Sequence, residues 1–172
     1  MLPLYLTVVA LTGVERLAEL VVSARNARWS FARGGVESGR AHFPAMVALH
    51  TALLVACVVE VLVAHRPFLP WLGWPALALV VASQALRWWC IGTLGPRWNT
   101  RVIVVRDLPL VARGPYRWLR HPNYVAVVVE GIALPLVHTA WVTALVFTVL
   151  NAVLLLRFRI PAEERALATV PA

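Results

Sequence analysis

The segment GPYRWLRHPNYVAVVVE, residues 114–130, gathers side chains whose types could do chemistry. Basic, aromatic and amide groups come directly before an apolar run: Arg117, Arg120, His121, Asn123 and Tyr124. The run carries a single carboxylate, Glu130, seven residues after Asn123, so the two would share one face of a helix. Cations and aromatic rings together suit a polar, aromatic ligand. The segment therefore predicts a binding site beside an intramembrane carboxylate.

A second group of polar residues lies near the C-terminus, in RFRIPAEER. It sets Arg159 four residues before Glu163, which would place both on one face of a continuing helix. Pro161 lies between them and disturbs that geometry. If both segments share one face of a membrane, they predict a pocket for a zwitterionic, aromatic, water-soluble ligand beside a lipid-accessible cavity.

The elements that must hold these groups are membrane helices. The chain has 172 residues, of which 60% are hydrophobic and only 14% charged, and its mean hydropathy is +0.75. This is too apolar for an ordinary soluble domain, and several stretches approach the roughly 20 apolar residues that cross a bilayer. The predicted helices cover residues 2–24, 43–64, 72–94, 123–134 and 140–159. The predicted fold is an all-α integral membrane protein with five transmembrane helices and a single domain, 1–172.

The distribution of arginine predicts the orientation. Basic residues concentrate in segments 25–42, 95–121 and 157–165, which five spans would place on one side. The positive-inside rule makes that side the cytoplasm, with the N-terminus outside and helix 2–24 retained rather than cleaved. The net charge of +8 comes from arginines at the ends of the apolar spans, where cytoplasmic loops concentrate them, so no nucleic-acid partner is expected. The five histidines and two cysteines form no ligand-like cluster, so no metal is expected either, and Cys57 and Cys90 are predicted to be buried free thiols.

Ionisable groups within the predicted spans are functional candidates, because inserting each one costs roughly 2.5–3.5 kcal/mol. They include Glu15 and Glu19, four residues apart on the first helix, and Glu60 on the second. A structural alternative pairs such groups, for instance Arg87 with Glu15 or Glu60, only to hold the helices together. A non-enzymatic alternative is a small transporter or scaffold subunit in which the carboxylates form an ion or proton path.

GPYRWLRHPNY, followed one hydrophobic hairpin later by RFRIPAEERAL, resembles the isoprenylcysteine carboxyl methyltransferase family and the related membrane phospholipid methyltransferases. The similarity covers a methyltransferase-like core over residues 84–167. It implies an enzyme that binds S-adenosylmethionine at the cytosolic face and methylates a lipophilic acceptor that enters from the bilayer. The cofactor motifs would be residues 108–124 and 159–164.

The resemblance also assigns residues. The cofactor-binding positions it implies are Leu108, Pro109, Leu110, Val111, Tyr116, His121, Pro122, Asn123, Tyr124 and Glu163. Arg159 matches the acceptor-side arginine of the family, and the expected catalytic residues are Glu130, Arg159 and Arg120.

LGPRWNTRVIV and RHPNYVAVVVE resemble, more than the prenylcysteine enzymes, a bacterial branch that sits beside type III polyketide synthases and is thought to O-methylate alkylpyrones and alkylresorcinols. A hydroxyl acceptor benefits from losing its proton, and Glu130 could accept it, whereas a prenylcysteine carboxylate needs no base. The prediction is therefore a hydroxyl O-methyltransferase of the bacterial plasma membrane, functionally linked to such a synthase. The alternatives are a prenylcysteine-type carboxyl methyltransferase and a phospholipid N-methyltransferase.

Overall fold

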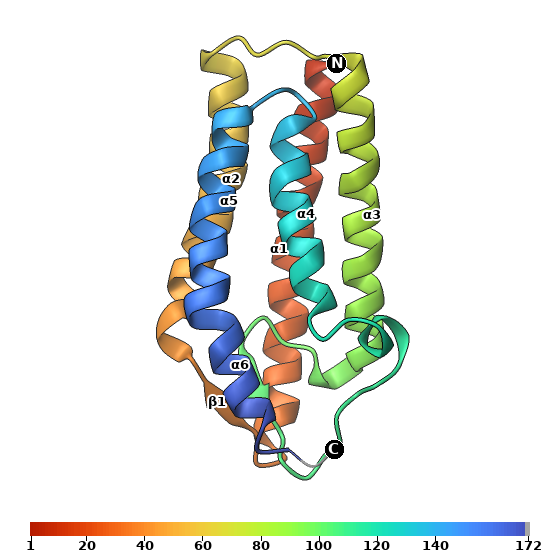
Figure 1. Cartoon of the computed structure of the whole chain (residues 1–172), viewed down its shortest axis with the longest axis vertical. Helices are drawn as coiled ribbons and strands as arrows, with labels where there is room; N and C mark the ends of the chain where they lie inside the picture. Colours follow the sequence, from red (N-terminus) through yellow and green to blue (C-terminus); the bar gives the residue numbers. More distant parts are fainter. Residues whose placement is uncertain (171–172) are drawn as a thin grey trace.

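The structure, a computed structural model that describes residues 1–170, is a bundle of long helices that run along one axis (Figure 1). The helices are α1 (Leu2–Phe31), α2 (Phe43–Val63), α3 (Pro70–Leu94), α4 (Pro122–Leu136), α5 (Trp141–Leu154) and α6 (Ile160–Leu167). Short 3-10 turns, η1 (Arg40–His42), η2 (Gly95–Arg97) and η3 (Gly114–Arg117), lie in the connections. Helix α1 begins at one end of the bundle and α6 ends at the other. The predicted all-α fold is confirmed.

Within residues 1–170, three helical segments are long and apolar enough to cross a membrane: Arg40–Val63, Pro70–Arg97 and Trp141–Leu167. The predicted number of five transmembrane helices therefore stays a prediction. Helix α4 is apolar but has only 15 residues. Large apolar side chains on the outside of the bundle are exposed, among them Val55, Val81 and Leu145. Such an outward apolar surface is expected where lipid, rather than water, surrounds the helices.

The hydrophobic core lies in the half of the bundle that contains the start of α1. It joins α1, α2, α3, α4 and α5 through side chains such as Tyr5, Cys57, Val80, Leu134 and Phe147. Helix α4 packs against α3 on one side and α5 on the other. Gly131 makes the second contact close, because a Cβ there would lie 2.1 Å from Phe147 Cε1. Helix α4 is thus held centrally, and it carries residues from both predicted parts of the site.

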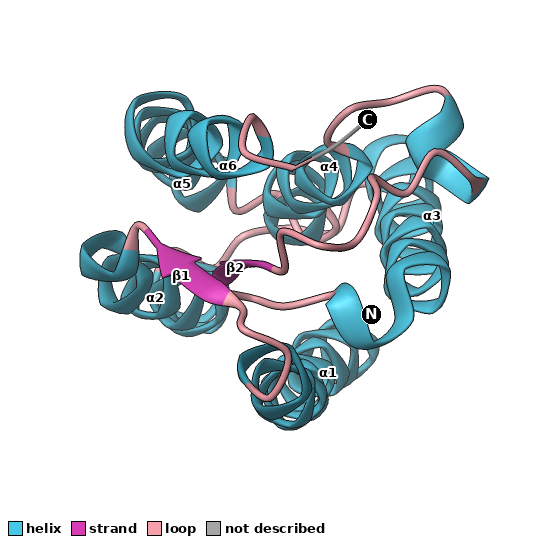
Figure 2. Cartoon of the chain, turned by 90° about the horizontal axis from the view of Figure 1, so that it is seen from below, coloured by secondary structure: helices cyan, strands magenta, loops and turns pink. Residues whose placement is uncertain are grey.

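A small antiparallel hairpin, β1 (Val36–Ser38) and β2 (Val102–Val104), was not predicted from the sequence. It crosses the end of the bundle, where Val36 pairs with Val104 and Ser38 with Val102 (Figure 2). Both strands also contact α6. The prediction that segments 25–42 and 95–121 and the C-terminal segment lie at one end is therefore confirmed. Helix α1 continues to Phe31, beyond the predicted end at residue 24, because Asn26 on its last turns donates hydrogen bonds to the carbonyls of Gly95 and Trp98.

Helices α5 and α6 are joined by a turn of π-helix, η4 (Leu155–Arg159). Pro161, at the start of α6, has no N–H and its ring excludes the carbonyl four residues earlier, so the helix must widen there. The helix axis continues through the proline, and Arg159 lies in the widened turn. Such turns occur often at functional sites.

Candidate active site

Tyr124, on the first turn of α4, connects two charged side chains from the C-terminal part of the chain. Its hydroxyl accepts a 2.9 Å hydrogen bond from Arg159 Nε and donates one to Glu163 Oε2. Tyr124 is only 8% exposed and Arg159 only 5%. The two sequence motifs therefore meet, and Tyr124, Arg159, Glu163 and His121 are called the Tyr124 cluster below.

His121 completes this cluster from the residue that precedes α4. Its ring stacks on Tyr124, with centroids 5.4 Å apart and planes 23° apart. Its Nδ1 lies 3.5 Å from Glu163 Oε1, and its Nε2 lies 3.4 Å from Glu164 Oε1. The Glu163 carboxylate raises the pKa of His121, Glu164 acts in the same direction, and burial opposes them. Contact with two carboxylates thus favours the protonated ring.

Two prolines explain how the chain brings these side chains together. Pro122 is the first residue of α4, where a missing N–H is harmless, so the helix begins directly after His121. Pro161 widens the helix at η4, where Arg159 lies buried. The sequence predicted that His121, Tyr124, Arg159 and Glu163 would form one site, and the structure brings them together.

Two polar atoms at the Tyr124 cluster are buried without a hydrogen bond within the described residues. His121 Nδ1 still has the 3.5 Å contact with Glu163, whereas Asn123 Oδ1 has no partner of its own among those residues. A buried acceptor without a partner is costly, so a ligand carrying amino or hydroxyl groups would be stabilised at Asn123. The stacked rings and this free acceptor oxygen together fit a polar ligand with an aromatic ring, as expected for an adenosine derivative.

Tyr116 lies in η3, which packs against α3. Burial raises the pKa of its hydroxyl, and Cys90, Glu163 and Tyr124 act in the same direction, so the hydroxyl stays protonated. Within the described residues Tyr116 makes no hydrogen bond to the Tyr124 cluster, and its role in cofactor binding stays a prediction.

The remaining predicted binding residues lie in the connection between β2 and η3. There the Pro109 carbonyl accepts a 2.6 Å hydrogen bond from Arg97 Nη1, and Leu110 is exposed. Arg120 is also exposed, and it makes no hydrogen bond or ion pair within the part of the chain that the structure describes. The structure does not join residues 108–111 or Arg120 to the Tyr124 cluster, and their roles stay predictions.

Glu130 lies in a second group of charges, inside the bundle. Its Oε2 accepts hydrogen bonds from Arg87 Nη2 at 2.7 Å and from Arg16 Nη2 at 2.9 Å. Glu19 binds the same two guanidinium groups, with Oε2 2.7 Å from Arg16 Nη1 and Oε1 3.4 Å from Arg87 Nε. Glu19, Arg87 and Glu130 are at most 4% exposed. These four residues, the charge quartet, join α1, α3 and α4 and balance two positive against two negative charges.

These contacts correct the structural alternative, which paired Arg87 with Glu15 or Glu60. Glu15 instead accepts a 2.5 Å hydrogen bond from Trp88 Nε1. Glu60 binds Arg66 and accepts hydrogen bonds from the first backbone N–H groups of α5. Arg16 was not predicted from the sequence as a site residue. The signal was present, since a cation within an apolar helix requires a partner and Glu19 follows three residues later.

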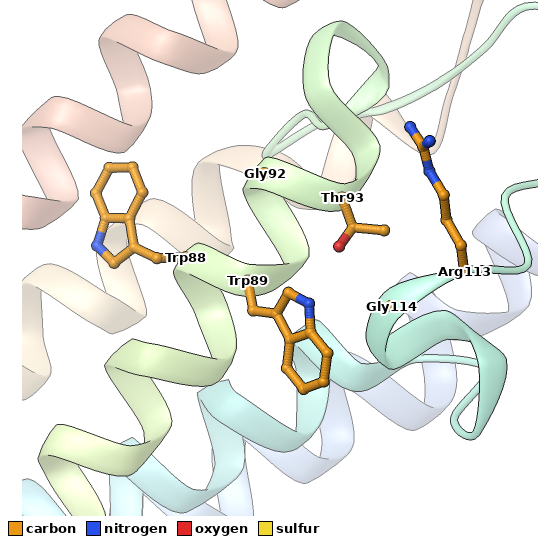
Figure 3. Close-up of a pocket in the computed structure, with 6 residues that line it drawn as sticks. All are labelled: Trp88, Trp89, Gly92, Thr93, Arg113 and Gly114. Atoms are coloured by element: carbon orange, nitrogen blue, oxygen red, sulfur yellow. The ribbon is translucent and has the colours of Figure 1, made fainter.

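An open hollow of about 470 Å³ lies between the end of α3 and the turn at Gly114. Trp88 and Trp89 point to opposite sides of α3, and Thr93 faces Gly114 (Figure 3). Gly114 has φ +56°, and a Cβ there would lie 2.5 Å from Thr93 Oγ1, so only glycine fits this turn. No member of the Tyr124 cluster is among the described residues that line this hollow.

Comparison with known proteins gives this geometry a context. The sequence model of the isoprenylcysteine carboxyl methyltransferase (ICMT) family matches residues 76–169. The matched range contains the whole Tyr124 cluster and two members of the charge quartet, Arg87 and Glu130; the other two members, Arg16 and Glu19, lie on α1 outside it. The chain is 38% identical over 160 residues to an uncharacterized protein, YpbQ, of Bacillus subtilis (strain 168), covering 92% of this chain and 94% of the relative. It is 26% identical over 156 residues to an uncharacterized protein of Haemophilus influenzae, covering 89% and 88%. No solved structure matches the chain significantly.

The apolar bundle and the family match together define a membrane methyltransferase. The chain belongs to the ICMT family. Methyltransferases of this family use S-adenosylmethionine, and the segment that carries the Tyr124 cluster lies within the family match.

Proposed function

We propose that this protein binds S-adenosylmethionine at the Tyr124 cluster and methylates a hydroxyl oxygen of a lipophilic acceptor, an alkylpyrone or alkylresorcinol. The observation that carries the proposal is the placement of two polar sites on α4. Tyr124 and Glu130 are six residues apart, which is about 9 Å along a helix. One site lies where α4 begins, beside the polar C-terminal segment, and the other lies within the apolar bundle. This arrangement suits an enzyme that must bring a water-soluble donor to a membrane-soluble acceptor.

At the donor side, the chain supplies a stacked pair of rings and the Asn123 side-chain oxygen, which makes no hydrogen bond within the described residues. S-adenosylmethionine, when bound, supplies an activated methyl group on a positively charged sulfur. The faces of His121 and Tyr124 can pack on an adenine ring, and a tyrosine face attracts a cation. Asn123 Oδ1 and the Glu163 carboxylate can accept hydrogen bonds from amino or ribose hydroxyl groups.

At the acceptor side, we infer that Glu130 is the group that takes the proton. Both arginines bind Oε2, and within the described chain no hydrogen bond is made to Oε1. Oε1 can therefore accept the proton of an acceptor hydroxyl as that oxygen gains its methyl group. Arg16 and Arg87 would stabilise the negative charge that develops nearby. Since the donor is already activated, most of the rate enhancement comes from alignment of the two reactants.

The test is methyl transfer by the purified protein in liposomes, using donor labelled in its methyl group. The acceptors are an alkylpyrone, an alkylresorcinol, a prenylcysteine and phosphatidylethanolamine. We expect label on the alkylpyrone or alkylresorcinol. General-base groups contribute about 100-fold or more to the rate, so Glu130→Gln should lower the turnover of the folded protein by about that factor, whereas Glu37→Gln, which alters a carboxylate that binds Arg101 on the hairpin, should not. A near-normal rate for Glu130→Gln would contradict the role of Glu130, and label on prenylcysteine or phosphatidylethanolamine alone would contradict the acceptor.

A further inference from the structure

A second hollow, of about 330 Å³, lies between the β1–β2 hairpin and α6, at the end of the bundle. Its apolar wall is the strand pair Val36 and Val104. Ala162 and Ala166, one turn apart on α6, form part of the opposite wall, and their small side chains leave the space open. Figure 2 shows the hairpin crossing this end of the molecule.

The polar groups around this hollow are positive or neutral. Arg106, after β2, and Arg165, on α6, both line it, as do the hydroxyl-bearing residues Ser38 and Thr169. Arg165 Nε donates a 3.0 Å hydrogen bond to the Pro161 carbonyl, which ties the guanidinium to α6 while its other N–H groups remain available. Of the described residues, none that lines this hollow is acidic.

The carboxylate on strand β1, Glu37, is directed away from the hollow. Successive side chains of a strand point to opposite faces, so Glu37 faces away from Val36 and Ser38. It binds Arg101, with Oε1 2.7 Å from Arg101 Nε and a second, shorter contact between Oε2 and Nη2. Arg106 and Arg165 therefore line the hollow without that carboxylate to neutralise them.

We propose that this hollow binds a phosphate-bearing anion, either the headgroup of an anionic lipid or free phosphate. Guanidinium groups bind phosphate through paired N–H donors, and two of them with a hydroxyl match the several oxygens of a phosphate group. The hollow lies at the hairpin end of the bundle, and the end of a membrane bundle is where lipid headgroups would meet it. The anion would fasten the hairpin to α6, which also carries Glu163.

The test measures the thermal unfolding midpoint of the full chain in a neutral detergent. One arm compares added phosphatidylglycerol with added phosphatidylcholine, and the other compares inorganic phosphate with chloride at equal ionic strength. A ligand that binds only the folded state raises the midpoint, so we expect a rise with phosphatidylglycerol, with phosphate, or with both. A response to phosphatidylglycerol alone identifies a lipid headgroup, and an equal response to phosphate identifies the free ion.

The variant Arg106→Gln/Arg165→Gln should lose at least about half of that rise, because it removes both guanidinium groups from the site. The matched control, Arg25→Gln/Arg157→Gln, removes two exposed arginines elsewhere and should keep the full rise. Equal rises in the two variants, or no rise in the unaltered protein, would overturn the proposal. Weakened binding of S-adenosylhomocysteine by Arg106→Gln/Arg165→Gln in phosphate-free detergent would also overturn it, because the hollow would then be part of the donor site.

Discussion

At the scale of single residues, the site depends on the Tyr124 hydroxyl. It is the only atom among the described residues that bonds to both Arg159 and Glu163, and so it fixes the separation of two opposite charges at the start of α4. A ligand that binds Glu163 or the ring faces would find them already positioned. The chemistry of the site therefore rests on a phenol hydroxyl as well as on the charged groups.

Replacing this hydroxyl should weaken donor binding. Hydrogen bonds to charged groups contribute about 1.5–3 kcal/mol, so Tyr124→Phe should lower the affinity for S-adenosylhomocysteine by about tenfold or more. Titration calorimetry of the purified protein measures this. The control is Tyr5→Phe, in the hydrophobic core, which should bind normally. Equal affinity of Tyr124→Phe and the unaltered protein would contradict the assigned role.

His121 should make the stability of the protein depend on pH. Its pKa is raised in the folded state above the ordinary value of 6.5 by Glu163 and Glu164, so the protonated ring stabilises the fold. That contribution is complete below pH 6.5 and disappears as the pH rises through the raised pKa. The difference in unfolding midpoint between the unaltered protein and His121→Gln should therefore shrink from pH 6 to pH 9. A difference that stays constant or grows would show that the ring is not held protonated.

At the scale of elements, α5 depends on a carboxylate from α2. Glu60 accepts hydrogen bonds from the N–H groups of Val142 and Thr143, at 3.2 and 2.7 Å, and from Thr143 Oγ1 at 2.7 Å. The first N–H groups of a helix have no partners within it, and a negative charge there also interacts favourably with the positive end of the helix dipole. An intramembrane carboxylate is thus explained by the helix that it caps, and it need not form part of an ion path.

Removing this cap should destabilise the bundle. Glu60→Ala should lower the free energy of unfolding by about 1–2 kcal/mol, the usual effect of losing a helix N-cap. Thermal or denaturant unfolding in detergent checks this, and donor binding by the folded protein should be unchanged because Glu60 is not in the Tyr124 cluster. A variant as stable as the unaltered protein would mean that water or lipid replaces the carboxylate without loss.

The sequence predicted the helices better than their connections. Long apolar runs with prolines near their ends give a strong signal, so α2, α3, α4 and α5 begin within two residues of the predicted starts. The strands β1 and β2 have three residues each, too short for an alternating pattern, and they pair segments 64 or more residues apart. Pro161 signals a disturbed helix, but the sequence does not show whether the helix will bend, break or widen there, so the π turn was not predicted.

At the scale of the whole molecule, the charge quartet ties α1 to the part of the chain that matches the family. Each carboxylate contacts both guanidinium groups, so no charge in the quartet is left without a partner of opposite sign. From sequence, Glu19, Arg87 and Glu130 stood out because charge within a membrane helix is costly. The pairing of these charges depends on how α1, α3 and α4 are rotated relative to one another. Helical periodicity alone does not determine this rotation.

Breaking the quartet should be far more damaging than removing a surface charge. Arg87→Gln leaves Glu19 and Glu130 with one guanidinium between them, and loss of one partner from a buried ion pair costs about 3–5 kcal/mol. We expect a large fall in the unfolding midpoint in detergent, and little change for Arg28→Gln, which removes an exposed arginine from α1. Equal midpoints for the two variants would show that the quartet contributes little to the assembly of α1 with α3 and α4.

Binding of the methyl donor at the Tyr124 cluster is tested most directly by calorimetry of S-adenosylmethionine with the detergent-purified protein. We expect saturable binding that is weakened in both His121→Ala and Glu163→Ala and retained in Glu37→Ala, which alters a carboxylate of the hairpin that binds Arg101. Folded protein that does not bind the donor, or that binds it equally well after both cluster substitutions, would show that the donor site lies elsewhere or is absent.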